Sequence, residues 1–220
     1  MITYNDIKHD EKIKAYIKKA DESLSVLGFT EHSFAHVGLV ASRAEYILKE
    51  LGYSEHDIEL VKIAAHLHDI GNIVNRKEHS QSGAVMAFRI LDNMNMDPYD
   101  IATIVTAIGN HDEGTGEAVN PISAALIIAD KSDVRRTRVR VEPTHPGFDI
   151  HDRVNYSVYE TDISIDKNAK TITLSLKIDT TISDVLSYFE IFMGRMLMCK
   201  KAAKTLGLNF KLIINDQVIM

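Results

Sequence analysis

The stretch Ala-Ala-His-Leu-His-Asp-Ile-Gly, at residues 64–71, decides how the rest of the chain is interpreted. It ends a segment of helical apolar spacing and places His68 and Asp69 directly before the breaker Gly71. Imidazole and carboxylate groups are the protein ligands of divalent transition metals, and a site built from several helices should show them at helix ends. The stretch therefore predicts a metal site at the end of a helix.

The adjacency of His68 and Asp69 favours two metal ions over one. Neighbouring residues on a regular helix diverge by about 100°, so the two side chains cannot point along one line. Two ions resolve this, because an aspartate can bridge two cations with its two oxygens while the histidine binds one of them. Such pairs, about 3.5–4 Å apart, are the usual device for cleaving phosphate esters and anhydrides. His66, roughly 200° round the helix from His68, is expected to face elsewhere as a packed histidine.

Helical patterns surround this stretch on both sides. Apolar residues recur at three- and four-residue spacing through the first two thirds of the chain, with glycine, proline or asparagine between the segments. His111 stands at the end of one segment, and Asp130 follows an apolar run, where an unpaired carboxylate would be costly. The predicted helices span residues 10–27, 33–51, 56–70, 79–94, 98–110 and 121–133.

The last third of the chain changes to alternating apolar residues. Ile163 and Ile165 precede a polar turn, and every second residue from Ile172 to Ile178 is apolar, which predicts a β-hairpin. A helix and one more strand follow, over residues 183–206 and 210–214.

We therefore expect a mainly α protein with two parts. The first is a helical region over residues 1–148, and the second is a small α+β appendage of strand-strand-helix-strand order over residues 149–220. The appendage is too small to be a safe independent domain, so it should pack on the helices. Residues 149–153 contain a second His-Asp pair, which is interpreted as a structural turn.

Composition excludes several classes of function. The chain has 220 residues, 45% of them apolar and 25% charged, and its formal charge of -6 disfavours nucleic acid as a partner. Its start has no secretory layout and no uncharged apolar run approaches the roughly 18 residues of a membrane span, so no membrane association is expected. The one cysteine, Cys199, excludes an internal disulfide framework and suits a reducing compartment. We expect a cytoplasmic protein.

Five ordered elements resemble the HD superfamily of metal-dependent phosphohydrolases. The interval of 32 residues from His36 to His68 is also similar to that family's spacing. The resemblance extends over residues 30–135 and implies an HD-type helical bundle. Its elements are His36 with Val40-Ala41, the stretch at 64–71, His79 with Gly83-Ala84, the run Asn110-His111-Asp112-Glu113, and Ala129-Asp130.

The resemblance also implies a ligand set and a mechanism. The ligands would be His36, His68, Asp69, His79, His111 and Asp130, of which His79 and His111 match the histidines that binuclear members add. Six ligands favour two divalent ions, and iron, manganese, nickel, zinc and magnesium remain open as their identity. Hydrolysis would proceed through a metal-activated water, with His68 and Asp69 as catalytic residues and Asp69 as the bridge.

Basic side chains supply candidate contacts to a phosphorylated substrate. The guanidinium fork suits phosphate geometry, and His32 lies one turn before His36 on the same helix face. The alternative for the basic cluster is a solvated face paired with Asp133 and Glu142. The candidates are His32, Arg76, Lys131, Arg135, Arg136 and Arg138.

The sequence thus predicts a metal-dependent phosphohydrolase for a nucleotide or a similar small phosphorylated metabolite. Within the family it is similar to the dinucleoside tetraphosphate hydrolase branch around His79, His111 and Asp130. One alternative is a cyclic-nucleotide phosphodiesterase, which needs room for two nucleoside units near residues 109–116. Another is a non-catalytic regulatory module with structural metals and a tail that mediates assembly, for example as a homodimer. Asn72, where the family often has lysine, mildly favours the latter.

Overall fold

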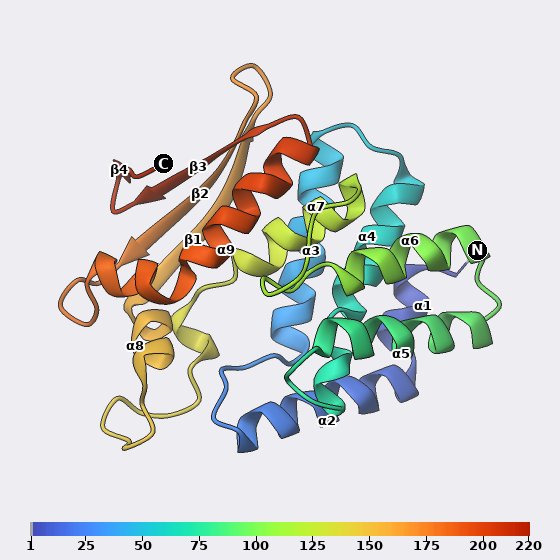
Figure 1. The fold of residues 1–220 in the computed structure, drawn as a ribbon, viewed down its shortest axis with the longest axis horizontal. Helices are drawn as coiled ribbons and strands as arrows, with labels where there is room; N and C mark the ends of the chain where they lie inside the picture. The colour runs from blue at the N-terminus through green and yellow to red at the C-terminus, as the bar shows by residue number, and fades with distance from the viewer. Residues whose placement is uncertain (1) are drawn as a thin grey trace.

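The computed structural model describes residues 2–220 as a helical block joined to a small sheet (Figure 1). Figure 1 shows the helices of the block on one side, the sheet on the other and a long helix between them. The block consists of α1 (Tyr4–His9), α2 (Glu11–Val26), α3 (Phe34–Glu50), α4 (Glu55–Leu67), α5 (His79–Asn93), α6 (Pro98–Gly109) and α7 (Pro121–Lys131), with the short 3-10 helices η1 (Ile70–Ile73) and η2 (Arg136–Arg138).

Side-chain caps fix where the helices of the block begin. The Ser33 hydroxyl accepts the Ala35 N–H at the start of α3, and the Ser54 hydroxyl accepts the Asp57 N–H at the start of α4. Asn120 and Ser123 form a reciprocal capping box at the start of α7. All six predicted helices are present. The third of them, α4, ends at Leu67, before the predicted residue 70, because the chain tightens there into η1.

The sheet has the strand order β1-β2-β3-β4. β1 (Val158–Asp166) pairs antiparallel with β2 (Thr171–Ile178), and β2 pairs parallel with β3 (Asn209–Ile214). A parallel pair needs a crossover, which here is α9 (Val185–Thr205). The predicted strand-strand-helix-strand order is therefore confirmed, and the mainly α fold class with it.

Besides the two 3-10 helices, three short elements were not predicted. These are α1, α8 (Ile150–Ser157) and β4 (Gln217–Val218), which pairs with the end of β3. The interpretation of residues 149–153 as a turn was wrong, because the Asp149 carboxylate accepts the Asp152 N–H and starts α8 there. The boundary predicted between residues 148 and 149 falls at this helix start and stays a prediction.

The appendage and the helical block share one hydrophobic core. Helix α9 packs against α7 on one side and β3 on the other. On the neighbouring face, the Arg43 guanidinium of α3 donates to the Thr161 carbonyl of β1 and to the Ser132 hydroxyl, each at 3.0 Å. Within residues 2–220 no helix combines the length and apolarity needed to cross a lipid bilayer.

Candidate functional site

The six predicted ligands converge from separate elements into one buried cluster. His36 lies in the first turn of α3, His79 begins α5, and Asp130 lies in the last turn of α7. His68 and Asp69 follow α4, and His111 follows α6. All six are between 0% and 9% exposed. Burial of so many ionisable groups is unfavourable unless each has a partner.

Gly71 lets two of these elements approach closely. A side-chain carbon there would overlap the backbone of His79 and Gly83. The turn after Asp69 therefore rests directly on the start of α5, and this contact brings His79 up to Asp69.

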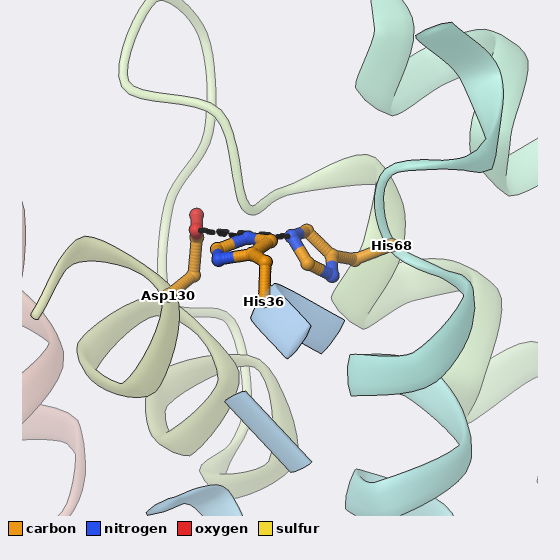
Figure 2. Close-up of side chains that lie close together, drawn as sticks. All are labelled: His36, His68 and Asp130. Carbon is orange, nitrogen blue, oxygen red and sulfur yellow. Dashed lines mark hydrogen bonds and ion pairs between the residues drawn. The ribbon is translucent and has the colours of Figure 1, made fainter. Parts of the chain in front are cut away.

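The first half of the cluster consists of His36, His68 and Asp130 (Figure 2). The His36 and His68 Nε2 atoms lie 3.3 Å apart. Asp130 Oδ1 lies 3.4 Å from His36 Nε2 and 3.7 Å from His68 Nε2. These three side chains could hold a metal ion between them.

The second half consists of His79 and His111, whose Nε2 atoms lie 3.1 Å apart. Asp69 stands between the halves. Its Oδ1 lies 3.4 Å from His79 Nε2 and 3.9 Å from His111 Nε2. Its Oδ2 lies 3.2 Å from His68 Nε2 and 3.5 Å from His36 Nε2. Each carboxylate oxygen of Asp69 therefore faces a different histidine pair.

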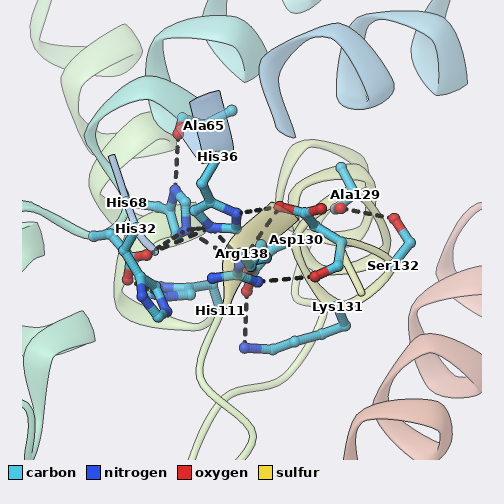
Figure 3. A network of polar contacts seen from close by, with 12 residues as sticks. His32, His36, Ala65, His68, His111, Ala129, Asp130, Lys131, Ser132 and Arg138 are labelled. Carbon is cyan, nitrogen blue, oxygen red and sulfur yellow. Dashed lines mark hydrogen bonds and ion pairs between the residues drawn. The ribbon is translucent and has the colours of Figure 1, made fainter. Parts of the chain in front are cut away.

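Hydrogen bonds at Nδ1 orient all four imidazoles. His36 Nδ1 is 2.7 Å from Asp133 Oδ2. The Nδ1 atoms of His68, His79 and His111 lie 2.6–3.0 Å from the backbone carbonyl oxygens of Ala65, Arg76 and Ile108, respectively. Figure 3 shows the contact between His68 and Ala65. A neutral imidazole that donates from Nδ1 keeps a lone pair on Nε2. The lone pairs of the paired Nε2 atoms would then face each other and repel. A cation between the two atoms would attract both lone pairs.

The spacing of these donor atoms fits metal coordination. Ligand bonds of about 2.1 Å place neighbouring ligand atoms roughly 3.0 to 3.4 Å apart in octahedral or tetrahedral sites. The Nε2 pairs, at 3.3 and 3.1 Å, agree with this range. Nitrogen and oxygen donors of this kind suit the divalent first-row metals.

The two halves differ in their preference for positive charge. At His68, burial opposes protonation, but the carboxylates of Asp69 and Asp130 outweigh it and raise the pKa to about 10. At His79, burial dominates and lowers the pKa to about 4. Nearby carboxylates therefore outweigh burial at His68, whereas burial outweighs them at His79.

A chain of charges links this cluster to the C-terminal appendage. Lys131 Nζ lies 2.8 Å from both Asp130 Oδ2 and Glu113 Oε2, and Arg195 Nε of α9 lies 3.1 Å from Glu113 Oε1. Burial would raise the pKa of Glu113, but Lys131 and Arg195 lower it to about 2. No role was predicted from the sequence for Glu113 or Arg195. Arg195 is the only charged residue between Phe192 and Cys199 of α9. A single charge in an apolar stretch of helix was the feature of the sequence that could have indicated a role for it.

A cavity of about 370 Å³ lies next to the cluster. Of the predicted substrate-binding residues, His32, Arg76 and Arg138 line it. The His32 ring packs on His36 at 5.4 Å between centroids, and Figure 3 shows His32 and Arg138 beside the clustered imidazoles. Arg76 Nη1 is 3.4 Å from His79 Nε2. The side chains of His32 and Arg76 therefore line the cavity and also contact the candidate ligands His36 and His79.

The other predicted substrate contacts lie away from this cavity wall. Arg135 pairs with Asp133 and Glu31, and Arg136 donates to the Tyr156 carbonyl. Lys131 is buried between its two carboxylate partners. Substrate contact by these three residues stays a prediction.

His66 is buried against Tyr4, with 5.7 Å between ring centroids, and both of its ring nitrogens lack a hydrogen-bond partner within residues 2–220. Burial lowers its pKa to about 4. It lies outside the cluster, as its position on the helix predicts.

The helical bundle gathers four histidines and two aspartates beside a small cavity, and two groups of three among them, His36-His68-Asp130 and His68-Asp69-His111, could each hold a metal ion. Residues 33–137 match the family model of the HD domain, and all six candidate ligands lie within the match. The match supports a metal-dependent hydrolase as the general class of protein.

Two further comparisons found related chains. An uncharacterized protein of Methanocaldococcus jannaschii, MJ1020, is 25% identical over 211 residues, which cover 86% of this chain and 79% of the relative. A crystal structure of a predicted HD superfamily hydrolase from an uncultured Thermotogales bacterium is 25% identical. The aligned region covers 58% of this chain and 69% of the Thermotogales chain, with a TM-score of 0.45.

Proposed function

We propose that the protein is a metal-dependent phosphohydrolase that uses two divalent ions to cleave a small phosphorylated metabolite. His36, His68 and Asp130 would hold one ion, His79 and His111 the other, and Asp69 would bridge them. Two ions in such a site supply an acidified water as nucleophile and polarise the phosphoryl oxygens.

One observation carries the proposal: the two oxygens of Asp69 face two different histidine pairs, at 3.2–3.5 Å and 3.4–3.9 Å. A single ion would leave one pair of Nε2 lone pairs opposed without a cation. Two ions bridged by the Asp69 carboxylate would satisfy both pairs at once.

The surrounding residues hold these groups in place. The Asp133 carboxylate lies 2.7 Å from His36 Nδ1, so it would hold the proton of a metal-bound His36 on Nδ1 and leave Nε2 for the ion. Asn72 Nδ2 donates to Asp69 Oδ1 at 3.0 Å and to the Asp69 carbonyl at 2.9 Å. Asn72 would thus orient the bridge, and its presence is compatible with catalysis.

The cavity favours a single small substrate. Its volume of about 370 Å³ is near the lower end of small-molecule sites, about 300–1,000 Å³. A mononucleotide or sugar phosphate suits this size better than a dinucleoside polyphosphate or a cyclic dinucleotide. The guanidiniums of Arg76 and Arg138 in its wall match a phosphate group.

Metal removal and reloading test the proposal. Chelated protein should release no phosphate from mononucleotides or sugar phosphates, and reloading with manganese, iron, nickel or zinc should restore release at about two ions per chain. Asp69→Asn should lose both the metal and the activity, whereas His145→Ala, in an exposed loop, serves as the matched control. Bound metal without phosphate release from any substrate under any loading would overturn the proposal.

A further inference from the structure

The C-terminal appendage forms one side of the cavity next to the metal cluster. His32, Arg76, Glu113 and Arg138 come from the helical block, whereas Asp152 and Asn155 of α8 and Phe192 and Arg195 of α9 come from the appendage. A substrate in this cavity would therefore touch both parts of the chain.

The cavity has a cationic side built from anchored guanidiniums. Arg138 donates from Nε to the Glu31 carbonyl at 2.9 Å and from Nη1 to the Asp133 carbonyl at 2.8 Å. Arg195 is held by Glu113 at Nε, and its Cζ lies 4.4 Å from the Phe192 ring centroid. Within residues 2–220, Arg138 Nη2 and both Nη atoms of Arg195 have no hydrogen-bond partner. These N–H groups remain available to an anion in the cavity that both residues line.

The appendage also lines the cavity with hydrogen-bond acceptors. Asp152 and Asn155 are 5% and 4% exposed. Within residues 2–220 the Asp152 carboxylate has no ion pair, and the backbone of Asp149 is its one hydrogen-bond partner; burial, and then Asp149, raise its pKa. Asn155 Nδ2 donates to the His151 carbonyl at 2.8 Å, which leaves its Oδ1 as an acceptor. Buried acceptors with spare lone pairs gain from a ligand that donates to them.

We propose that the appendage selects the substrate: Arg195 binds the phosphate together with Arg138, and Asp152 and Asn155 bind hydroxyl or ammonium groups at the other end of the same molecule. The substrate class is a phosphate monoester of a small polyol or amino alcohol, including a nucleoside monophosphate with its ribose diol. This inference rests on the proposed function and adds the chemistry that the cavity recognises.

A purely structural role for these residues makes a different prediction. If Arg195 only closes the ion-pair chain through Glu113 and Lys131, its loss should lower stability with no change in KM. If Asp152 only favours the start of α8 by its negative charge, its replacement should not alter the preference between substrates. The two interpretations therefore separate on KM and on substrate preference.

The test measures kcat and KM of the metal-loaded full chain with three kinds of phosphate monoester. Ribose 5-phosphate and adenosine monophosphate offer hydroxyls, phosphoethanolamine offers an ammonium group, and n-butyl phosphate offers neither. The wild type should prefer at least one polar ester over butyl phosphate by about tenfold or more in kcat/KM. Whichever polar ester is favoured identifies the donor group.

The variants localise each contact. Arg195→Ala should raise KM by roughly 10- to 100-fold for every ester, and Arg195→Lys should recover part of the loss because it restores charge without the fork. Asp152→Asn and Asp152→Ala should reduce the preference for the polar ester. Lys200→Ala and Glu160→Gln, both exposed in the appendage, are the matched controls. Thermal melting of each variant reports whether it is folded.

The outcomes distinguish the inference from the proposed function. If the wild type hydrolyses these esters and folded Arg195 and Asp152 variants keep its KM and its preference, the inference is wrong and the proposed function stands. If the wild type releases no phosphate under any metal loading, the proposed function is wrong. Calorimetric binding of ribose 5-phosphate then tests the cavity directly: binding lost in Arg195→Ala supports it, and binding equal to wild type, or none in the wild type, overturns it.

Discussion

The two halves of the cluster place the same kind of candidate ligand, an imidazole pair, in different electrostatic settings. His36 and His68 share Asp130, and the Asp133 carboxylate lies behind His36. Within residues 2–220, Asp69 is the one carboxylate within 4.0 Å of the Nε2 atoms of His79 and His111, and Arg76 Nη1 is 3.4 Å from His79 Nε2. Because both halves have two histidines but differ in nearby carboxylates, we expect their metal affinities to differ. We expect a tightly held ion in the first half and a readily exchanged one in the second.

Removing the bridge should have the largest effect. Asp69→Asn takes a negative charge from both halves at once, so both ions should be lost and phosphate release should fall by more than about 100-fold, the upper end for changes outside the ligand shell. Elemental analysis and a phosphate assay measure this. The account fails if the variant keeps two ions per chain and the wild-type rate.

Breaking one half at a time tests the comparison directly. His111→Ala should leave about one ion bound, because His36, His68, Asp130 and Asp69 remain. Asp130→Ala should release the first ion and weaken the second, and it also leaves Lys131 with only Glu113 as a partner. Equilibrium dialysis of both variants measures the stoichiometry, and equal loss in the two would contradict the assigned difference.

Asp133→Asn should weaken the first half by a smaller amount. The variant loses the charge that fixes His36 Nδ1, so metal affinity should fall by about 10- to 100-fold. Competition with a chelator of known affinity measures this. Asp133 also pairs with Arg135 and lies near Arg138, so some loss of thermal stability is expected too. An unchanged affinity would show that Asp133 does not support His36.

The metal-free protein should show opposite pH responses in the two halves. The pKa values of His36 and His68 are raised from 6.5 to about 9 and about 10. Their stabilising charge is complete below pH 6.5 and is lost as the pH rises toward 9–10. His79 of the second half, and His66 outside the cluster, have pKa values lowered to about 4. They therefore contribute to folding stability above pH 6.5 and lose this contribution as the pH falls toward 4. Melting temperatures of chelated protein should therefore peak near neutral pH, and a flat alkaline limb would contradict the assignment for His36 and His68.

The helices and strands could be predicted because each depends on a pattern of neighbouring residues. Period-three and period-four apolar spacing located the helices, and strand alternation located the hairpin, because burial of one face requires it. The short helix α8 was not predicted because its first turn, from Asp149, has the polar composition of a loop. Its Asp152 and Asn155 were consequently not considered as part of a cavity.

Long-range polar contacts could not be predicted in the same way. Arg195 and Glu113 are 82 residues apart, and nothing in either local sequence names the other as its partner. Ligand candidates were visible because histidine and aspartate beside helix breakers are chemically distinctive. The residues that orient them, such as Asp133 behind His36, become identifiable only when the helices are packed.

Anomalous diffraction from crystals of the metal-loaded protein is the most direct test of the central claim. The account predicts two peaks about 3.5–4 Å apart, one beside His36, His68 and Asp130 and the other beside His79 and His111, with an oxygen of Asp69 directed to each. A single peak, or density at a position that these side chains do not reach, would contradict the bridged two-ion site.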